Sequence, residues 1–165
     1  DAIIAALDYA ITNGVKVSNH SYGGSYFSGL EYEMYYKAYS NGHIAVCAAG
    51  NELVDNDLYP SYPTSYNLPN IISVAACDHN DQLAWFTNYG KESVDIAGPG
   101  MDILSTYAIL TNVPPEATYD TISGTSMATP HVAGVCALIW SIAPWASWDM
   151  IRDAVLQGAR YDKGL

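Results

Sequence analysis

The chain has few basic residues. Six lysines and arginines stand against 17 aspartates and glutamates among 165 residues, which gives a formal net charge of −11. Nucleic-acid binding relies on basic side chains that neutralise phosphates, so this balance argues against a nucleic-acid partner. The acidic excess is compatible with binding a cation or a basic peptide, and equally with a role in solubility alone.

Cysteines are also scarce, and their number is odd. The three cysteines, Cys47, Cys77 and Cys136, all lie in apolar stretches of the sequence. Small apolar surroundings of this kind favour buried free thiols over a disulfide framework. A bridge between Cys47 and Cys77 is the alternative, if the two residues lie on neighbouring strands.

Long hydrophobic runs are absent. No run of about 18 apolar residues interrupts the chain, so the sequence predicts no membrane span. Half of the residues are nevertheless hydrophobic. A chain of this length and composition is sufficient for one domain with a substantial core, and we expect residues 1–165 to form a single domain.

The apolar residues that are present alternate between helical and strand-like spacing. This alternation predicts an α/β fold with a mostly parallel sheet. Residues 50–70 are rich in proline, asparagine, aspartate and tyrosine and predict a long loop, which in a compact domain is commonly functional. The expected helices cover about 3–11, 29–40, 126–141 and 147–157, and the expected strands about 15–19, 44–49, 71–76, 83–86, 94–97 and 103–106.

One stretch of twelve residues carries the strongest chemical signal. Ser123 to Gly134 reads SGTSMATPHVAG, and Ser126 within it opens an apolar helical run. A hydroxyl at a helix N-terminus lies beside free backbone N–H groups and the positive end of the helix dipole. Acyl transfer needs such a place, because the attacked carbonyl becomes an oxyanion. For an isolated serine, the simpler reading is a polar helix cap.

Two further segments precede this stretch in the chain. Residues 46–51 read VCAAGN, and residues 17–24 read VSNHSYGG. Each is weak alone, since Gly-Asn is a common turn and Gly-Gly a common loop. Together, in this order, the three segments resemble the subtilisin-like serine proteases, the subtilases. The resemblance runs almost from Asp1 to Leu165.

The resemblance implies a three-layer subtilisin-like fold and a nucleophile, Ser126. It also implies that the Asn51 amide and the Ser126 backbone N–H hold the oxyanion during peptide hydrolysis. Thr125 lies beside this hole, where its hydroxyl either assists or caps the helix locally. The substrate is then a peptide or protein, and the chemistry requires no cofactor.

Two short segments are expected to form the walls of the pocket for the residue before the cut. Small residues there leave room for an apolar or aromatic side chain. Glu52 lies at the rim, where it either accepts lysine or arginine or only faces solvent, so the preference stays open. The walls are Ser21, Tyr22 and Gly23 on one side and Ala48, Ala49 and Gly50 on the other, with the floor near residues 61–63.

A base for Ser126 is missing from the sequence. In subtilases an aspartate near a Thr-Gly turn and a histidine in a His-Gly-Thr segment precede the pocket wall, and neither segment is present here. The four histidines, His20, His43, His79 and His131, are expected to be packing or surface residues. We therefore expect a partial catalytic domain that lacks its N-terminal side, with the triad aspartate and histidine outside this chain, and no activity of the chain alone.

Two other readings remain. The chain is a non-catalytic pseudoprotease that binds peptides or a partner, or it belongs to an unrelated α/β-hydrolase such as an esterase. An α/β-hydrolase needs Gly-x-Ser-x-Gly, whereas Ala128 stands at the final position here, and no histidine follows His131. The sequence upstream of Asp1 would separate a protease from a pseudoprotease.

Family resemblance also suggests a weak calcium site. Hard cations take several oxygens, often carbonyls together with a carboxylate. The candidate ligands are the carbonyls near Tyr66, Leu68 and Ile71 with the carboxylate of Asp95. The alternative is that Asp95 caps or pairs locally. The family further suggests a secreted or extracellular protein.

Overall fold

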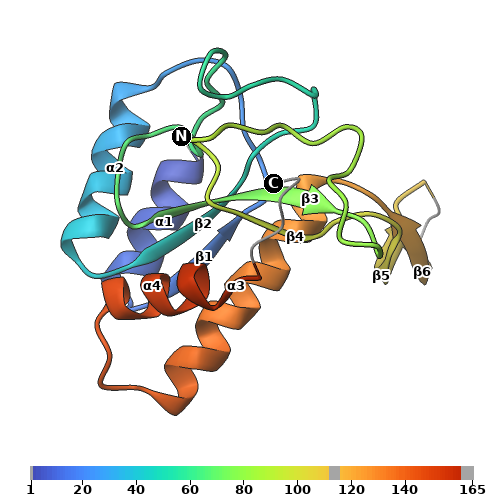
Figure 1. The fold of residues 1–165 in the computed structure, drawn as a ribbon. Coiled ribbons are helices and arrows are strands. Elements are labelled where there is room, and N and C mark those ends of the chain that lie inside the picture. The colour runs from blue at the N-terminus through green and yellow to red at the C-terminus, as the bar shows by residue number, and fades with distance from the viewer. Residues whose placement is uncertain (1, 112–115, 161–165) are drawn as a thin grey trace.

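A parallel sheet of four strands forms the centre of the molecule, in a computed structural model that describes residues 2–111 and 116–160. Two helices cover each face of the sheet, and a two-stranded antiparallel hairpin projects from one end (Figure 1). The three-layer α/β fold expected from the sequence is thus confirmed. In chain order the elements are α1 (Ala2–Thr12), β1 (Val17–His20), α2 (Gly29–Ser40), β2 (Ile44–Ala48), β3 (Ile71–Cys77), β4 (Ile96–Pro99), β5 (Ile103–Ile109), β6 (Glu116–Ile122), α3 (Thr125–Ile142) and α4 (Trp148–Gly158).

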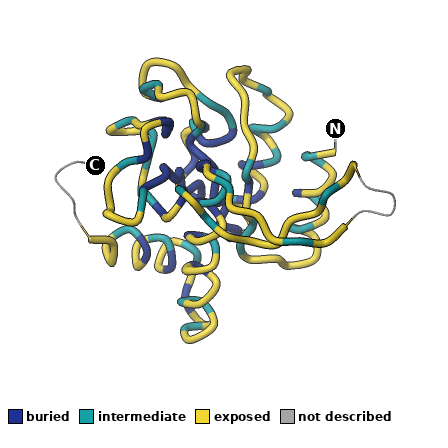
Figure 2. The backbone as a smooth tube through the Cα atoms, turned by 90° about the vertical axis from the view of Figure 1, so that its right-hand side faces the viewer, coloured by how far each residue is buried: buried dark blue, intermediate teal, exposed yellow. Residues whose placement is uncertain are grey.

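The two central strands have no polar face. Every residue of β2 and β3 is buried, as expected for a parallel sheet that is covered on both sides. Side chains alternate between the two cores: Ile44 and Val46 pack with α3 and α4, whereas Ala45 and Cys47 pack with α1 and α2. The core therefore has two halves, one on each face of the sheet. Figure 2 shows the buried segments gathered at the centre of the molecule.

Local sequence signals determine where the helices begin and end. Ser28 caps α2, because its Oγ accepts a hydrogen bond from the Glu31 N–H at 3.3 Å. At the other end of α2 the Asn41 N–H bonds back to the Ala38 carbonyl. The helix predicted over 29–40 is found at those residues, and the last helix follows Ser147 as predicted.

Two predictions about strands were wrong. Residues 83–86 form no strand: Leu83 makes a single bridge with Cys77, and a turn then brings Ala84 and Phe86 into the core. The apolar run there marked burial rather than a strand. The sequence analysis also missed β6, which pairs with β5 along its whole length. Most of this hairpin is exposed (Figure 2).

Helix α3 is long and apolar enough, by length and composition alone, to cross a membrane, contrary to the expectation from the sequence. Its side chains Ala128, Val132 and Cys136 are buried against the sheet, as in a core helix.

The three cysteines are buried and free, as predicted.

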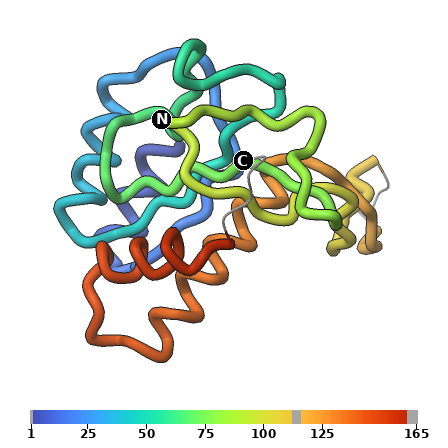
Figure 3. Tube along the Cα trace, viewed as in Figure 1, coloured from blue at the N-terminus to red at the C-terminus, as the bar shows by residue number. Residues whose placement is uncertain are grey.

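The carboxyl ends of the strands bring two distant loops together. Gly24, after β1, pairs with Tyr62 in the long loop after β2: the Gly24 N–H donates to the Tyr62 carbonyl at 2.9 Å, and the Tyr62 N–H donates back at 2.7 Å. Both loops run along the same edge of the molecule, where Figure 3 shows them next to each other. This edge contains the candidate site.

Candidate active site

Ser126 lies in the first turn of α3, at the edge where the strands end. Gly124 is the residue before the helix and offers no side chain to cap it, so the first N–H groups of α3 depend on partners outside this residue's side chain. The Ser126 hydroxyl donates to the Ser21 carbonyl at 3.3 Å, and the Ser21 hydroxyl donates to the Ser126 carbonyl at 2.8 Å. These two bonds attach the segment after β1 to the start of α3.

Asn51 faces the same helix from the turn after β2. Its Oδ1 accepts hydrogen bonds from the Thr125 N–H at 2.9 Å and from the Thr125 hydroxyl at 3.1 Å. Because only the amide oxygen can accept, these bonds fix the orientation of the amide. The Nδ2 group then points away from Thr125, and it has no hydrogen-bond partner among the residues that the structure describes. The Thr125 hydroxyl thus holds Asn51.

The nitrogen atoms of the two predicted oxyanion donors border one space. A Cβ atom at Gly124 would lie 3.7 Å from the Ser126 N, 3.8 Å from the Asn51 Nδ2 and 3.7 Å from the Met127 Sδ. The space that this glycine leaves open is therefore bordered by both nitrogen atoms. Preorganised donors around a common point are what stabilises a developing oxyanion.

Asn88 supports the turn that carries Asn51, and the sequence analysis missed this residue. Its Oδ1 accepts from the Glu52 N–H at 2.8 Å and from the Val54 N–H at 3.3 Å, on the far side of Asn51. Its Nδ2 lies 3.1 Å from the Ala49 carbonyl, on the near side. Gly50 has a φ of 115°, and a Cβ there would come within 2.3 Å of the Asn88 Nδ2. Only glycine fits beneath this amide.

Glu52 is part of the same support. Its Oε2 accepts from the Asn51 backbone N–H at 2.9 Å and from the Asn88 Nδ2 at 3.0 Å. The side chain stays exposed and borders the cleft, as its predicted place at the rim requires. It also does something that neither expected reading included, because its carboxylate braces the turn.

A cleft with a volume of about 650 Å³ joins these groups. The predicted wall residue Ala49 does not line it: this residue is fully buried, and its carbonyl accepts from the Asn56 and Asn88 amides. Ser21 reaches the site through its backbone carbonyl rather than by lining the cleft. Of the predicted residues, Tyr22, Gly23, Ala48, Gly50, Asn51, Glu52, Ser61 and Ser126 line it, and Leu58, Tyr59 and Asn88 join them.

The four histidines make their contacts elsewhere. His20 and His43 are buried and bond to Ser18, and His131 bonds to the Met127 carbonyl within its own helix. His79 is exposed in a turn. Burial lowers the pKa of His20 to about 4 and also lowers the pKa of His43. No hydrogen bond joins Ser126 to a histidine among the described residues.

Asp95 does not fit the suggested calcium site. One carboxylate oxygen accepts from the Ser73 N–H at 2.8 Å, and the other lies 3.2 Å from the Arg152 guanidinium. A cation already stands beside this carboxylate, which disfavours a second one. Over residues 2–111 and 116–160, no group of three or more histidine, cysteine, aspartate or glutamate side chains could hold a metal ion. These contacts favour local pairing of Asp95.

Comparison with known proteins agrees with this geometry. The model of the subtilase family matches residues 1–165. Thermitase of Thermoactinomyces vulgaris is 43% identical over 85% of this chain and 46% of its own length. Subtilisin DY of Bacillus licheniformis is 36% identical over 99% of this chain and 59% of its own length. A protease structure from Pseudoalteromonas arctica superposes with a TM-score of 0.82 and 34% identity, covering 91% of this chain and 46% of that one.

These relatives extend well beyond the matched part, and the chain spans about half the length of thermitase and of subtilisin DY. The family match nevertheless covers the whole of this chain, and the superposition covers 91% of it. The chain belongs to the subtilase family, the subtilisin-like serine proteases.

Proposed function

We propose that the protein containing this chain is a serine endopeptidase that acts through an acyl-enzyme at Ser126. The observation that carries this proposal is that the Ser126 N and the Asn51 Nδ2 border the same space at Gly124, in the turn of helix that carries the Ser126 hydroxyl. Acyl transfer needs donors at that place, because the carbonyl oxygen of the substrate gains charge there. A helix cap alone does not need the second donor.

The chemistry follows from the roles of these groups. The Ser126 Oγ attacks the carbonyl carbon of the peptide bond, and its proton passes to a histidine that the N-terminal part of the same protease supplies. The oxyanion then rests between the Asn51 Nδ2 and the Ser126 N–H. The histidine returns the proton to the leaving amine, and water releases the acyl group by the same steps. The triad aspartate, also outside this chain, orients that histidine.

The cleft indicates the class of substrate. Gly23, Gly24, Ala48 and Gly50 contribute little or no side chain to its lining, whereas Tyr22 contributes a ring. Such a lining suits a large apolar or aromatic residue before the cut. Many subtilisin-type relatives are secreted, and we propose the same location for this protein.

A labelling experiment tests the proposal. The 165-residue chain is treated with a fluorophosphonate probe, alone and together with the N-terminal part of the same protease. We expect labelling of Ser126 and hydrolysis of a fluorogenic peptide only in the combined sample, because the chain alone has no base. Ser126→Ala is the control and should abolish both signals.

Two outcomes would contradict the proposal. Stoichiometric labelling of Ser126 in the chain alone would show that its hydroxyl is activated without an external histidine. A combined sample that binds peptides but neither labels nor hydrolyses would favour a pseudoprotease.

A further inference from the structure

A network of hydrogen-bonded polar side chains lies in the otherwise apolar layer between β1 and the helices α1 and α2. Ser18 and His20 project from β1 toward this layer, and His43 stands just before β2. The Ser18 Oγ lies 2.5 Å from the His20 Nε2 and 2.6 Å from the His43 Nε2. Both histidines are at most 4% exposed, so their polar atoms depend on these partners.

The Val15 carbonyl determines the direction of each hydrogen bond in this network. The His43 Nδ1 lies 2.7 Å from the Val15 carbonyl, which can only accept, so the Nδ1 of His43 carries the proton. The neutral ring then accepts at Nε2, and the Ser18 hydroxyl donates to it. The Ser18 oxygen accepts in turn from the His20 Nε2, which leaves the His20 Nδ1 as an acceptor. Burial keeps both rings neutral, because it lowers both pKa values.

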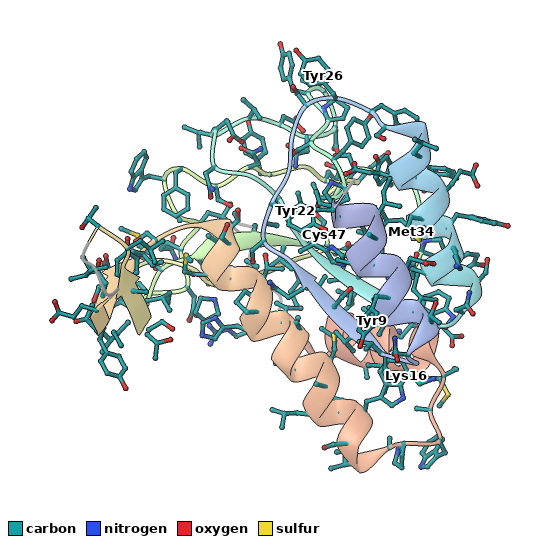
Figure 4. All side chains as sticks on the ribbon, turned by 180° about the vertical axis from the view of Figure 1, so that it is seen from behind. Tyr9, Lys16, Tyr22, Tyr26, Met34 and Cys47 are labelled. Atoms are coloured by element: carbon teal, nitrogen blue, oxygen red, sulfur yellow. The ribbon has the colours of Figure 1, made fainter. Side chains whose placement is uncertain are left out.

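The last acceptor of this network, the His20 Nδ1, is linked to the cleft through Tyr22. The His20 Nδ1 lies 2.6 Å from the Tyr22 hydroxyl and 2.8 Å from the hydroxyl of Tyr35 in α2. The two phenols are 3.3 Å apart, and the Tyr22 hydroxyl is the nearer of the two to this nitrogen. Tyr35 is buried, whereas the Tyr22 ring lines the cleft. Figure 4 shows Tyr22 beside Cys47, the β2 residue that pairs with His20.

We propose that His20 is a positioning residue: it holds the Tyr22 phenol in the wall of the cleft and thereby sets the preference for a large side chain before the cut. This inference rests on the proposed endopeptidase function. Of the two predicted wall segments, the other residues that line the cleft are Gly23, Ala48 and Gly50, so Tyr22 is the large side chain of these walls, while Leu58 and Tyr59 line the cleft from the long loop after β2. Without the bond to Nδ1, the ring of Tyr22 gains rotamer freedom and fills the wall less well.

Substitutions at His20 test the inference in the intact protease that contains this chain. The measured quantity is the ratio of kcat/KM for peptides with Phe and with Ala before the cut. His20→Leu removes the acceptor and should lower this ratio by about 3- to 10-fold, the range expected for one net hydrogen bond. His20→Asn offers an amide oxygen near the position of Nδ1 and should restore most of the ratio. His79→Leu, in an exposed turn, is the matched control and should leave the ratio unchanged.

Tyr22→Phe keeps the ring and removes only the hydroxyl, so it tests the tether without emptying a buried position. It should lower the same ratio by about 3- to 10-fold. A ratio that stays at the wild-type value in both His20→Leu and Tyr22→Phe would overturn the inference. So would a His20→Asn variant that behaves like His20→Leu, because a purely structural role for the imidazole would not be rescued by the acceptor.

Imidazole ¹⁵N resonances of the protein at pH 7 give a readout that does not depend on activity. We expect His20 protonated at Nε2 and His43 at Nδ1, and Tyr22→Phe should shift the His20 Nδ1 resonance more than any resonance of His43. A His20 protonated at Nδ1 cannot accept from Tyr22 and would overturn the inference. A protein that cleaves neither peptide contradicts the proposed function. In that case the resonances alone show whether the Tyr22 hydroxyl donates to the His20 Nδ1.

Discussion

At the scale of single residues, the orientation of one amide determines what the site can do. The two ends of the Asn51 side chain differ: the oxygen is held by the Thr125 N–H and hydroxyl, and the nitrogen faces the space beside Gly124. Reversal of the amide would place an N–H group against the Thr125 N–H, two donors facing each other. The helix start therefore orients the donor before any substrate binds, which is the condition for stabilising an oxyanion without reorganisation.

Asn51→Ala in the intact protease should lower kcat by about 10²–10³ with little change in KM, the effect typical of losing one oxyanion-hole donor in a subtilisin. The hydrogen bond forms mainly in the transition state, so substrate binding should be nearly unaffected. Asn51→Asp is a useful companion, since its oxygens still accept from Thr125 while the donor is lost. Steady-state kinetics that show only a higher KM for both variants would assign Asn51 to substrate binding instead.

The sequence predicted the residues of the site unequally. Ser126 and Asn51 each lie in a short contiguous segment whose pattern signals its chemistry. Asn88 could not be found this way, because it acts on a turn 36 residues away and its own surroundings look like an ordinary turn. The bond between His43 and Ser18 was also out of reach, since it joins residues 25 positions apart and depends on the register of β1 against β2.

At the scale of elements, the turn after β2 is held by side chains in addition to backbone hydrogen bonds, such as the one from the Asn88 N–H to the Gly50 carbonyl at 2.9 Å. Asn88 contacts both sides of Asn51, and Asn56 adds a bond of 2.9 Å to the Ala49 carbonyl. Asn88 is buried, so its own amide depends on these protein partners rather than on water. The position of Asn51, the proposed oxyanion donor, thus depends on a residue that follows β3.

Asn88→Ala should lower the free energy of unfolding by about 2–4 kcal/mol, because it leaves the Glu52 and Val54 N–H groups without their partner. It should also lower kcat more than it raises KM, since Asn51 loses its fixed position. Urea unfolding and steady-state kinetics measure the two effects. Asn80→Ala, in an exposed turn, is the matched control and should change neither. A destabilised Asn88→Ala variant with unchanged kcat would limit Asn88 to a structural role.

The elements themselves were predictable where burial shapes the sequence. Residues 29–40 carry a serine cap and an Asn-Gly stop, and the helix has those bounds. Strand β6 carries no such signal: most residues of Glu116–Ile122 are exposed, so neither face selects apolar side chains. Its pairing with β5 comes from the hairpin geometry, which a hydrophobic pattern does not encode.

At the scale of the whole molecule, the two cores on opposite sides of the sheet differ in their content of buried titratable groups. The core under α3 and α4 consists of apolar side chains. The core under α1 and α2 also contains the buried histidines His20 and His43, whose proton positions are fixed by Ser18 and Val15. A layer that holds neutral histidines is stable only while they stay neutral, so the stability of the whole fold is linked to pH.

This linkage has a definite sign and window. In the unfolded chain His20 takes up a proton near pH 6.5, whereas burial holds its folded pKa at about 4. Between these values the unfolded state binds more protons, so stability is full above pH 6.5 and falls as the pH drops toward 4. The loss is about 1.4 kcal/mol per pH unit, or about 3 kcal/mol in all for His20. His43, whose pKa is also lowered by burial, adds to it. Asp95 has a pKa raised by burial and acts in the opposite direction.

Urea unfolding between pH 7 and pH 4.5 checks this, because the surface carboxyls with lowered pKa values, such as Asp57 and Asp78, lose stability only at lower pH. We expect the free energy of unfolding to fall steadily below pH 6.5 in the wild-type chain. His20→Asn cannot titrate in this range and should show a shallower slope, whatever its stability at pH 7, while His79→Leu should keep the wild-type slope. Equal slopes in all three would mean that His20 is already protonated in the folded state, and the order of hydrogen bonds from Val15 to Tyr22 would then be wrong.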